Sequence, residues 1–405
     1  MATVSITATA SSRSPGRGKA VARAAIVAGA LCAAAAFLPA SLASWADVDQ
    51  PQLAVRIAPW SAVAAADAAA ELGTTNPTNG RVRALVSRAL GRDLTQVPAI
   101  ELRALDLAVS GRPAEARRLF GLSNQLSRRS LPTRLWLIQD AVDRGNVAGA
   151  LRHFDIALRT TTDAQPILFP VLGKASADPT LTEPLARMLD RPSDWRLMYL
   201  NWAVANSKDV TSTARVVAHM RDAEFVVSSG IDQRLIERLA SARGFAEARL
   251  LNQRFGRSSA GVADPNFADP GARYPFGWGL VSNASLGAER ILSGSSSMLG
   301  YRAAPANSGQ VAAQLLTLVP GKYALNVRTG LRGTGTPPYW SVLCGDGSGG
   351  ELARVEQPLA ANGTAGTTFV VPAGCSAQWL TLRVRPAADA AEQSGAVASV
   401  SISPA

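Results

Sequence analysis

Small residues recur at a regular interval between residues 81 and 256. Ala150 follows Ala116 at the same interval as Ala248 follows Ala214, and each of the four alanines lies in a similar block. A period of about 34 residues, with a small residue where two helices cross, is typical of helix-turn-helix repeats that stack into a solenoid. We interpret the longer interval from Ala150 to Ala214 as one complete repeat and one shortened repeat. The pattern therefore predicts an all-α repeat solenoid over residues 81–256.

Helix boundary signals divide this region into pairs. Pro98, Pro113 and Pro132 suit first helical turns, where the missing N–H is not needed, while Gly111 and Gly145 suit the tight turn inside a pair. The expected pairs are 98–110 with 113–126, 132–144 with 147–159, 193–206 with 210–223, and 230–243 with 245–255. Four prolines between residues 166 and 184 disturb the pattern, so a degenerate repeat is expected there.

The repeat residues resemble the tetratricopeptide repeat family. Gly145, Ala150, Phe154 and Ala157 occupy the family's small, small, aromatic and small positions, and Gly111, Ala116, Phe120 and Ser123 do so one repeat earlier. The resemblance implies a concave surface for an envelope protein or a peptide partner. It assigns helix-packing roles to seven residues: Ala116, Phe120, Ala150, Phe154, Ala157, Ala214 and Ala248.

The pattern changes after residue 256, where 257–264 is interpreted as a linker. The rest is rich in Gly, Ser and Thr and has short alternating runs that predict strands. The expected strands are 277–282, 288–292, 298–303, 311–319, 322–329, 339–344, 367–371, 378–385 and 397–402. Their number and spacing are typical of a β-sandwich. Residues 265–405 are therefore predicted to form a C-terminal all-β domain.

Three stretches in this domain resemble carbohydrate-binding modules of the galactose-binding-like, jelly-roll type. They are the opening 266–278, the central hairpin 315–328 and the closing strand 396–402. The resemblance implies polysaccharide binding, and many family members hold a structural calcium near the two ends of the domain. Only Asp264 and Asp269 remain at the opening here, and the closing strand has Ala398 and Ser399 where an acid is expected. We therefore expect no metal and no cofactor.

Sugar binding by stacking needs an exposed aromatic ring. The candidates are Tyr339, Tyr301 and Trp278, and Tyr339 is preferred because Pro337 and Pro338 hold it at the entrance to a strand. Trp278 is also open to the interpretation that it lies in the sandwich core. Trp340 alternates to the other side of the strand and is expected in the core.

The N-terminus has the pattern of an export segment. Residues 1–23 form a basic leader with no acidic residue, and residues 24–43 carry no charge. The segment 24–46 is either a cleaved signal peptide or a retained transmembrane helix, because it combines spanning length with small residues near its end. Both alternatives place the chain on the periplasmic side of a bacterial inner membrane. Residues 47–80 are interpreted as a linker with a first helix.

Export changes the interpretation of charge and cysteine. The net charge of +11 includes four basic residues in the leader, and the remainder is dispersed, so no nucleic-acid partner is expected. Cys344 and Cys375 are the two cysteines beyond the export segment 24–46. In an oxidising compartment such a pair is most simply a disulfide, with two separate buried thiols as the alternative.

Motifs of the familiar catalytic classes are missing from the sequence. It contains no Gly-x-Ser-x-Gly, no phosphate-binding glycine loop and no His-Glu-x-x-His. Asp346, Glu351 and Glu356 are the acidic residues available for a glycosidase pair. We expect a non-enzymatic envelope protein linked to assembly, export or retention of an extracellular polysaccharide. The alternatives are a protein scaffold with a purely structural sandwich and a glycan-cleaving enzyme.

Overall fold

A computed structural model describes residues 50–405 except 258–260, 270, 295, 348–349 and 387–391. The chain forms two compact units, one ending at Thr161 and one beginning at Thr162. The predicted leader 1–23 and nearly all of the segment before the first helix lie outside the described residues, as does the export segment 24–46. Among the helices that the structure describes, none is both long enough and apolar enough to cross a membrane.

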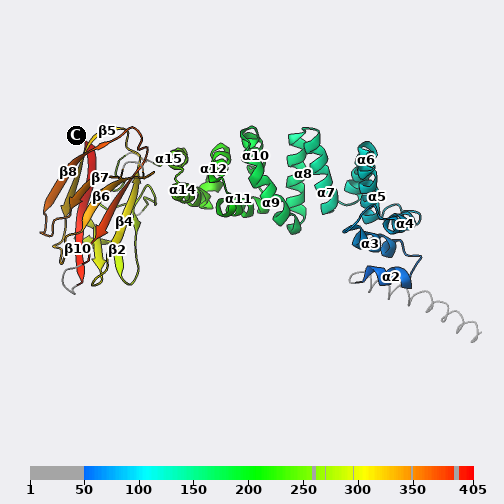
Figure 1. The fold of residues 1–405 in the computed structure, drawn as a ribbon, viewed down its shortest axis with the longest axis horizontal. Helices are drawn as coiled ribbons and strands as arrows, with labels where there is room; N and C mark the ends of the chain where they lie inside the picture. The colour runs from blue at the N-terminus through cyan, green and yellow to red at the C-terminus, as the bar shows by residue number, and fades with distance from the viewer. Residues whose placement is uncertain (1–49, 258–260, 270, 295, 348–349, 387–391) are drawn as a thin grey trace, which may run out of the picture. The chain divides into compact units, whose positions relative to one another are not determined.

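The described part of the first unit is entirely helical (Figure 1). Its helices are α2 (Pro51–Ile57), α3 (Ala62–Gly73), α4 (Gly80–Leu90), α5 (Val97–Val109), α6 (Pro113–Leu126), α7 (Leu131–Asp143) and α8 (Val147–Thr160). Helices α3 and α4, α5 and α6, and α7 and α8 pack as consecutive pairs. The segment 47–80, expected to hold one helix, contains α2 and α3.

Local sequence signals explain where these helices begin and turn. The side chains of Ser61, Ser130 and Asn146 each accept a hydrogen bond from an N–H in the first turn of α3, α7 and α8. Gly111 and Gly145 adopt φ of +75° and +68° between the members of two pairs. That left-handed conformation costs glycine little, so both residues allow the chain to reverse direction within a few residues.

An ion pair between an arginine and a buried aspartate occurs twice in the first unit at the repeat interval. Arg83 in α4 binds Asp106 in α5 at 2.6 Å, and Arg117 in α6 binds Asp140 in α7 at 2.6 Å. The two residues of each pair have the same separation in sequence, and the second pair follows the first at the interval that separates the alanines of successive repeats. The pair therefore connects the second helix of one hairpin to the first helix of the next.

The second unit begins with shorter helices. They are η1 (Thr162–Ala164), α9 (Gln165–Ala175), η2 (Pro179–Leu181), α10 (Thr182–Leu189), α11 (Asp194–Asn206), α12 (Val210–His219), α13 (Ala223–Ser228), α14 (Ile231–Ser241) and α15 (Phe245–Arg254). Helices α9 and α10 occupy the region where the sequence predicted a degenerate repeat. The seven residues with predicted packing roles, in both units, are all buried.

A β-sandwich completes the second unit (Figure 1). Its strands are β1 (Gly279–Leu280), β2 (Leu286–Ser293), β3 (Ser296–Ala303), β4 (Gly309–Leu316), β5 (Gly321–Thr329), β6 (Tyr339–Cys344), β7 (Glu351–Glu356), β8 (Thr364–Val371), β9 (Gln378–Val384) and β10 (Gln393–Pro404). One antiparallel sheet has the order β1-β4-β9-β6-β7, and the other has the order β2-β3-β10-β5-β8. The nine expected strands correspond to nine of these ten, and β7 was missed.

The sandwich core lies between the two sheets. Trp340 on β6 is fully buried and meets Trp278 edge to face at 5.6 Å. Leu299, Val327 and Val400 close the core from the other sheet. A disulfide joins Cys344, the last residue of β6, to Cys375 before β9, which confirms the predicted bridge.

Candidate functional site

The outer face of the sheet β2-β3-β10-β5-β8 carries polar side chains from all five strands. Alternation along each strand turns one set of residues into the core and the next set outward. The register aligns Glu289 with Gly300, Arg302 with Ser394, and Arg328 with both Ser399 and Thr364. These outward residues belong to one surface, which we name the trough.

The trough has a first hollow at β2, β3 and the start of β10. Its volume is about 440 Å³. Its lining includes four charged side chains and the hydroxyl at the start of β10, from Glu289, Arg302, Arg332, Glu392 and Ser394. Because all five are exposed, the hollow presents both donors and acceptors to solvent.

A second hollow of about 380 Å³ lies across β10, β5 and β8. It is lined by the polar side chains of Asn326, Arg328, Thr364, Ser399 and Ser401. Hydroxyl and amide groups of this kind donate and accept hydrogen bonds, so they match the alternating hydroxyls of a sugar chain.

Small residues keep the trough open between its strands. A methyl group added at Gly300 would lie 3.2 Å from a methyl carbon of Ile291, and one at Gly366 would lie 2.6 Å from the side-chain oxygen of Asn326. Both glycines lie on the outward side of their strands, opposite Ala396 and Asn326 respectively. The shallow backbone surface therefore depends on residues that have no side chain.

Two of the three predicted sugar-stacking rings are core residues. Trp278 and Tyr301 are each 5% exposed. The indole N–H of Trp278 donates to the carbonyl oxygen of Asp264 at 3.0 Å, and burial raises the pKa of Tyr301 to about 12. Tyr301 contributes to the wall of the first hollow, but neither ring offers a face to a sugar. The expectation of an exposed ring was wrong for Tyr301, which alternation along β3 turns inward. For Trp278 the structure agrees with the alternative interpretation as a core residue.

Tyr339 lies on the outer face of the other sheet and is half-buried. The guanidinium carbons of Arg354 and Arg385 lie 4.5 and 4.7 Å from its ring centre. Two cations against one ring compete with a sugar for the same π-surface. Tyr339 belongs to the other sheet and lines neither hollow of the trough.

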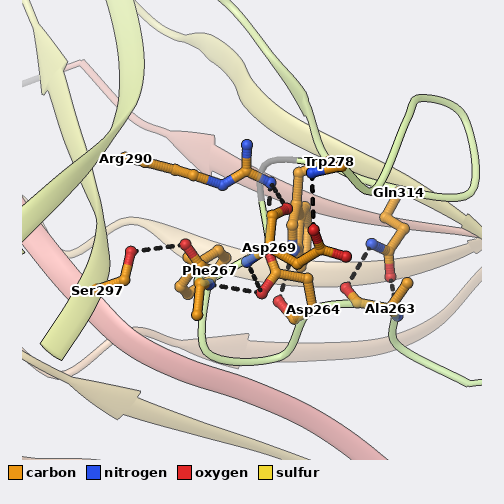
Figure 2. Close-up of polar contacts among 10 residues, drawn as sticks. Ala263, Asp264, Phe267, Asp269, Trp278, Arg290, Ser297 and Gln314 are labelled. Carbon is orange, nitrogen blue, oxygen red and sulfur yellow. Dashed lines mark hydrogen bonds and ion pairs between the residues drawn. The ribbon is translucent and has the colours of Figure 1, made fainter.

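The loop before β1 contains the two acids left from the expected calcium region, and Figure 2 shows how they are held. The Asp264 carboxylate accepts hydrogen bonds from the N–H groups of Ala268 and Asp269 and forms an ion pair with Arg290 at 3.1 Å. Arg290 also donates to the carbonyl oxygen of Asp269 at 3.0 Å. The cation at this loop is therefore a guanidinium of the chain itself, and the residues do not fit a calcium ion. Over the described residues, no group of three or more His, Cys, Asp or Glu side chains is placed to hold a metal.

The acidic residues named for a glycosidase pair do not meet. Glu351 and Glu356 belong to β7 and form ion pairs with Arg354 and Arg385, at 2.7 Å in both cases. Asp346 follows β6, where its carbonyl oxygen accepts a hydrogen bond from Arg243. The carboxylates that share a hollow are Glu289 and Glu392, which no motif in the sequence marked.

Comparisons with known proteins give only distant likenesses. No protein-family model and no curated protein matches this chain. The solved structures similar to it include TmCBM61 in complex with β-1,4-galactotriose, at 14% identity and TM-score 0.25, covering 35% of this chain and 100% of that one. They also include the CBM22-1 xylan-binding domain of Paenibacillus barcinonensis Xyn10C, at 15% identity and TM-score 0.25, covering 36% and 96%.

A third similar structure is the enzymatically active domain of tailspike protein 4 from bacteriophage CBA120. It has 12% identity and a TM-score of 0.25, and the match covers 34% of this chain and 20% of that one. Such values carry no argument about a ligand, so the function is argued from the trough.

Proposed function

We propose that this chain is a non-enzymatic cell-envelope protein whose β-sandwich binds polysaccharide in the trough. The observation that carries the proposal is the pair of hollows on one sheet face, lined by hydroxyl, amide, carboxylate and guanidinium groups. Most of these groups belong to paired strands, whose backbone positions are set before a ligand binds. The sequence resemblance to jelly-roll carbohydrate-binding modules agrees with this use of the domain.

The helical region has a separate role in the proposal. We assign it to an envelope protein partner, in keeping with its resemblance to tetratricopeptide repeats. The basic leader and the uncharged segment 24–46 support a location on the periplasmic side of the inner membrane. A periplasm-active reporter fused after Ala405 is expected to function, and activity of a cytoplasm-only reporter at the same position would overturn the location.

A glycan array probed with the full-length chain tests the polysaccharide proposal. The double variant Asn326→Ala with Ser401→Ala removes two polar groups of the second hollow and is expected to lose at least tenfold in affinity for the bound glycan. Gln310→Ala is the matched control, because Gln310 is an exposed amide on β4 of the other sheet. Equal binding by both variants would show that the glycan binds outside the trough.

A glycan-cleaving activity is the second candidate, because Glu289 and Glu392 line the same hollow. Glycosidases use two carboxylates, one as the acid and one as the base or nucleophile. Release of reducing ends from a bound polysaccharide, abolished in Glu289→Gln and in Glu392→Gln, would establish this activity in place of the non-enzymatic role. Binding without release supports the first proposal.

A protein scaffold with a purely structural sandwich is the remaining alternative. It predicts that the full-length chain retains no envelope polysaccharide at millimolar sugar concentrations, while the helical region still recovers its protein partner. That result would replace the polysaccharide proposal.

A further inference from the structure

We propose that the ligand of the trough is an acidic polysaccharide, one that carries carboxylate or sulfate groups along its chain. The inference rests on the proposed polysaccharide binding and adds the charge of the ligand. It is carried by three arginines, by the absence of a stacking ring on the described part of the face, and by the polar groups around the arginines.

The arginines of the trough lack acidic partners. Arg302, Arg328 and Arg332 are exposed, and none of them forms an ion pair with any residue that the structure describes. Three other arginines of the sandwich, Arg290, Arg354 and Arg385, each have a carboxylate partner. Arg302 donates a hydrogen bond to the carbonyl oxygen of Asn283 at 3.1 Å, which leaves its charge without an acidic partner. Glu289 and Glu392 line the first hollow beside Arg302 and Arg332, whereas Arg328 lies in the second hollow. Arg328 is therefore the guanidinium most available to an anion from outside the chain.

The face offers no flat ring for a neutral sugar. Within the described residues, the outward positions of its five strands hold no Phe, Tyr or Trp. A sugar bound there loses the contribution of stacking and has to be held by hydrogen bonds and charge. Arginine meets this need because its planar fork binds a carboxylate through two parallel hydrogen bonds.

The second hollow shows how one acidic sugar is accommodated. Arg328 lies between Ser399 and Thr364 on the neighbouring strands, and Asn326 is the next outward residue on β5. The guanidinium can bind the negative group of the sugar, and the two hydroxyls and the amide can form hydrogen bonds with the ring hydroxyls beside that group. Among the residues that the structure describes, no carboxylate lines this hollow.

The two hollows are spaced for a polymer. Arg302 is aligned with Ser394 and Arg328 with Ser399 on the same strand β10. At about 3.3 Å per residue, and with a bulge between Val397 and Ser399, these positions lie roughly 13–17 Å apart along the strand. A chain that follows β10 therefore meets a guanidinium in each hollow, and its acidic groups bind at two separated points.

Binding of the full-length chain to polygalacturonate and to the same polymer after carboxyl reduction tests the inference. The reduced polymer keeps the sugar backbone and loses the charge, so it is expected to bind at least tenfold more weakly. Dextran sulfate and dextran form a second pair, which tells sulfate recognition from carboxylate recognition. Affinity for the acidic member is expected to fall as salt screens the charges.

Matched variants distinguish binding in the trough from general attraction to the positive net charge of the protein. Arg302→Gln and Arg328→Gln are each expected to weaken acidic-polymer binding by at least fivefold with an unchanged melting temperature. Arg273→Gln removes the same charge from an exposed loop position away from the trough and is expected to bind like the unaltered chain.

Four results would overturn the inference. Equal affinity for the charged and neutral members of both pairs would remove the charge requirement while leaving the polysaccharide proposal in place. Equal losses in the three arginine variants would show unspecific attraction to a basic protein, and equal binding of polyglutamate would show that the ligand is an acidic protein. Failure to bind any polysaccharide would defeat the proposed function as well.

Discussion

At the scale of single residues, buried polar groups in the helical region are held by side chains far away in the sequence. The Glu101 carboxylate accepts hydrogen bonds from the hydroxyls of Ser123, Ser130 and Thr133. The hydrogen bond from Arg117 holds the pKa of Asp140 below its usual range. The sequence marks none of these partners, because the side chains meet only after three helices have packed.

His153 provides a test of this packing through pH. Burial lowers its pKa, and the positive charges of Arg134 and Arg152 lower it further. The unfolded chain, with a histidine pKa of about 6.5, therefore binds the proton at a higher pH than the folded chain. Stability is expected to fall as the pH drops below about 6.5, because protonation then favours the unfolded state.

Urea unfolding at a series of pH values between about 7 and 5 measures this effect. His153→Gln is expected to flatten the dependence, whereas His219→Gln, at an exposed position, keeps it. An unchanged slope in His153→Gln would show that other groups govern the acid sensitivity.

At the scale of elements, the sequence predicted helices and strands best where the hydrophobic pattern is strongly periodic. Helix α6 and strand β6 have the predicted bounds. The bounds of α9 were not predicted because Pro170 lies inside the helix, and β7 was missed because its three exposed charges hide the buried Ala353 and Val355. The trough was not predictable either, since it joins outward residues of five strands whose alignment is set by the sheet register.

Helix packing around Ala150 gives a prediction at this scale. Ala150 is buried in α8, whereas Ala148 in the same helix is exposed. Ala150→Leu is expected to lower the free energy of unfolding by about 1–3 kcal/mol, because the added carbon atoms overpack the helix contact. Ala148→Leu is the control, and an equal loss in both variants would show that the repeat register is misassigned. Urea denaturation followed by circular dichroism measures both.

The loop held by Arg290 gives a second prediction. Removing this arginine leaves the buried Asp264 carboxylate without its cation, so Arg290→Ala is expected to destabilise the second unit by about 3–5 kcal/mol. EDTA and added calcium are expected to leave the melting temperature of the unaltered chain unchanged. A clear rise on addition of calcium would contradict the assignment of Arg290 as the cation of this loop.

At the scale of the whole molecule, the chain consists of two compact units with different internal constraints. The described part of the first unit depends on helix packing, ion pairs and side-chain hydrogen bonds. The second unit adds a sandwich in which a disulfide joins two positions 31 residues apart. This bridge connects the end of β6 to the loop that leads into β9, the strand beside it.

Reduction of the disulfide is therefore expected to act on one unit only. Opening a loop of this length costs about 3–4 kcal/mol of stability in the chain-entropy description. Unfolding of the full-length chain with and without dithiothreitol is expected to shift the transition of the second unit and leave that of the first unit in place. Labelling of both cysteines in the denatured, unreduced chain would show that the bridge is absent from the protein.

The twice-occurring ion pair of the first unit has a consequence for how that unit can change in length. Deletion of residues 97–130 removes one hairpin and brings Arg83 to the same distance in sequence from Asp140 that now separates it from Asp106. The shortened chain is expected to keep a cooperative transition for its first unit, because an acceptor again follows the arginine at the right place. Deletion of 97–126 shifts that acceptor by four positions and is expected to lose the transition. Such a unit can gain or lose whole hairpins in steps of one repeat. Its length then changes while the same kind of arginine–aspartate pair joins successive hairpins.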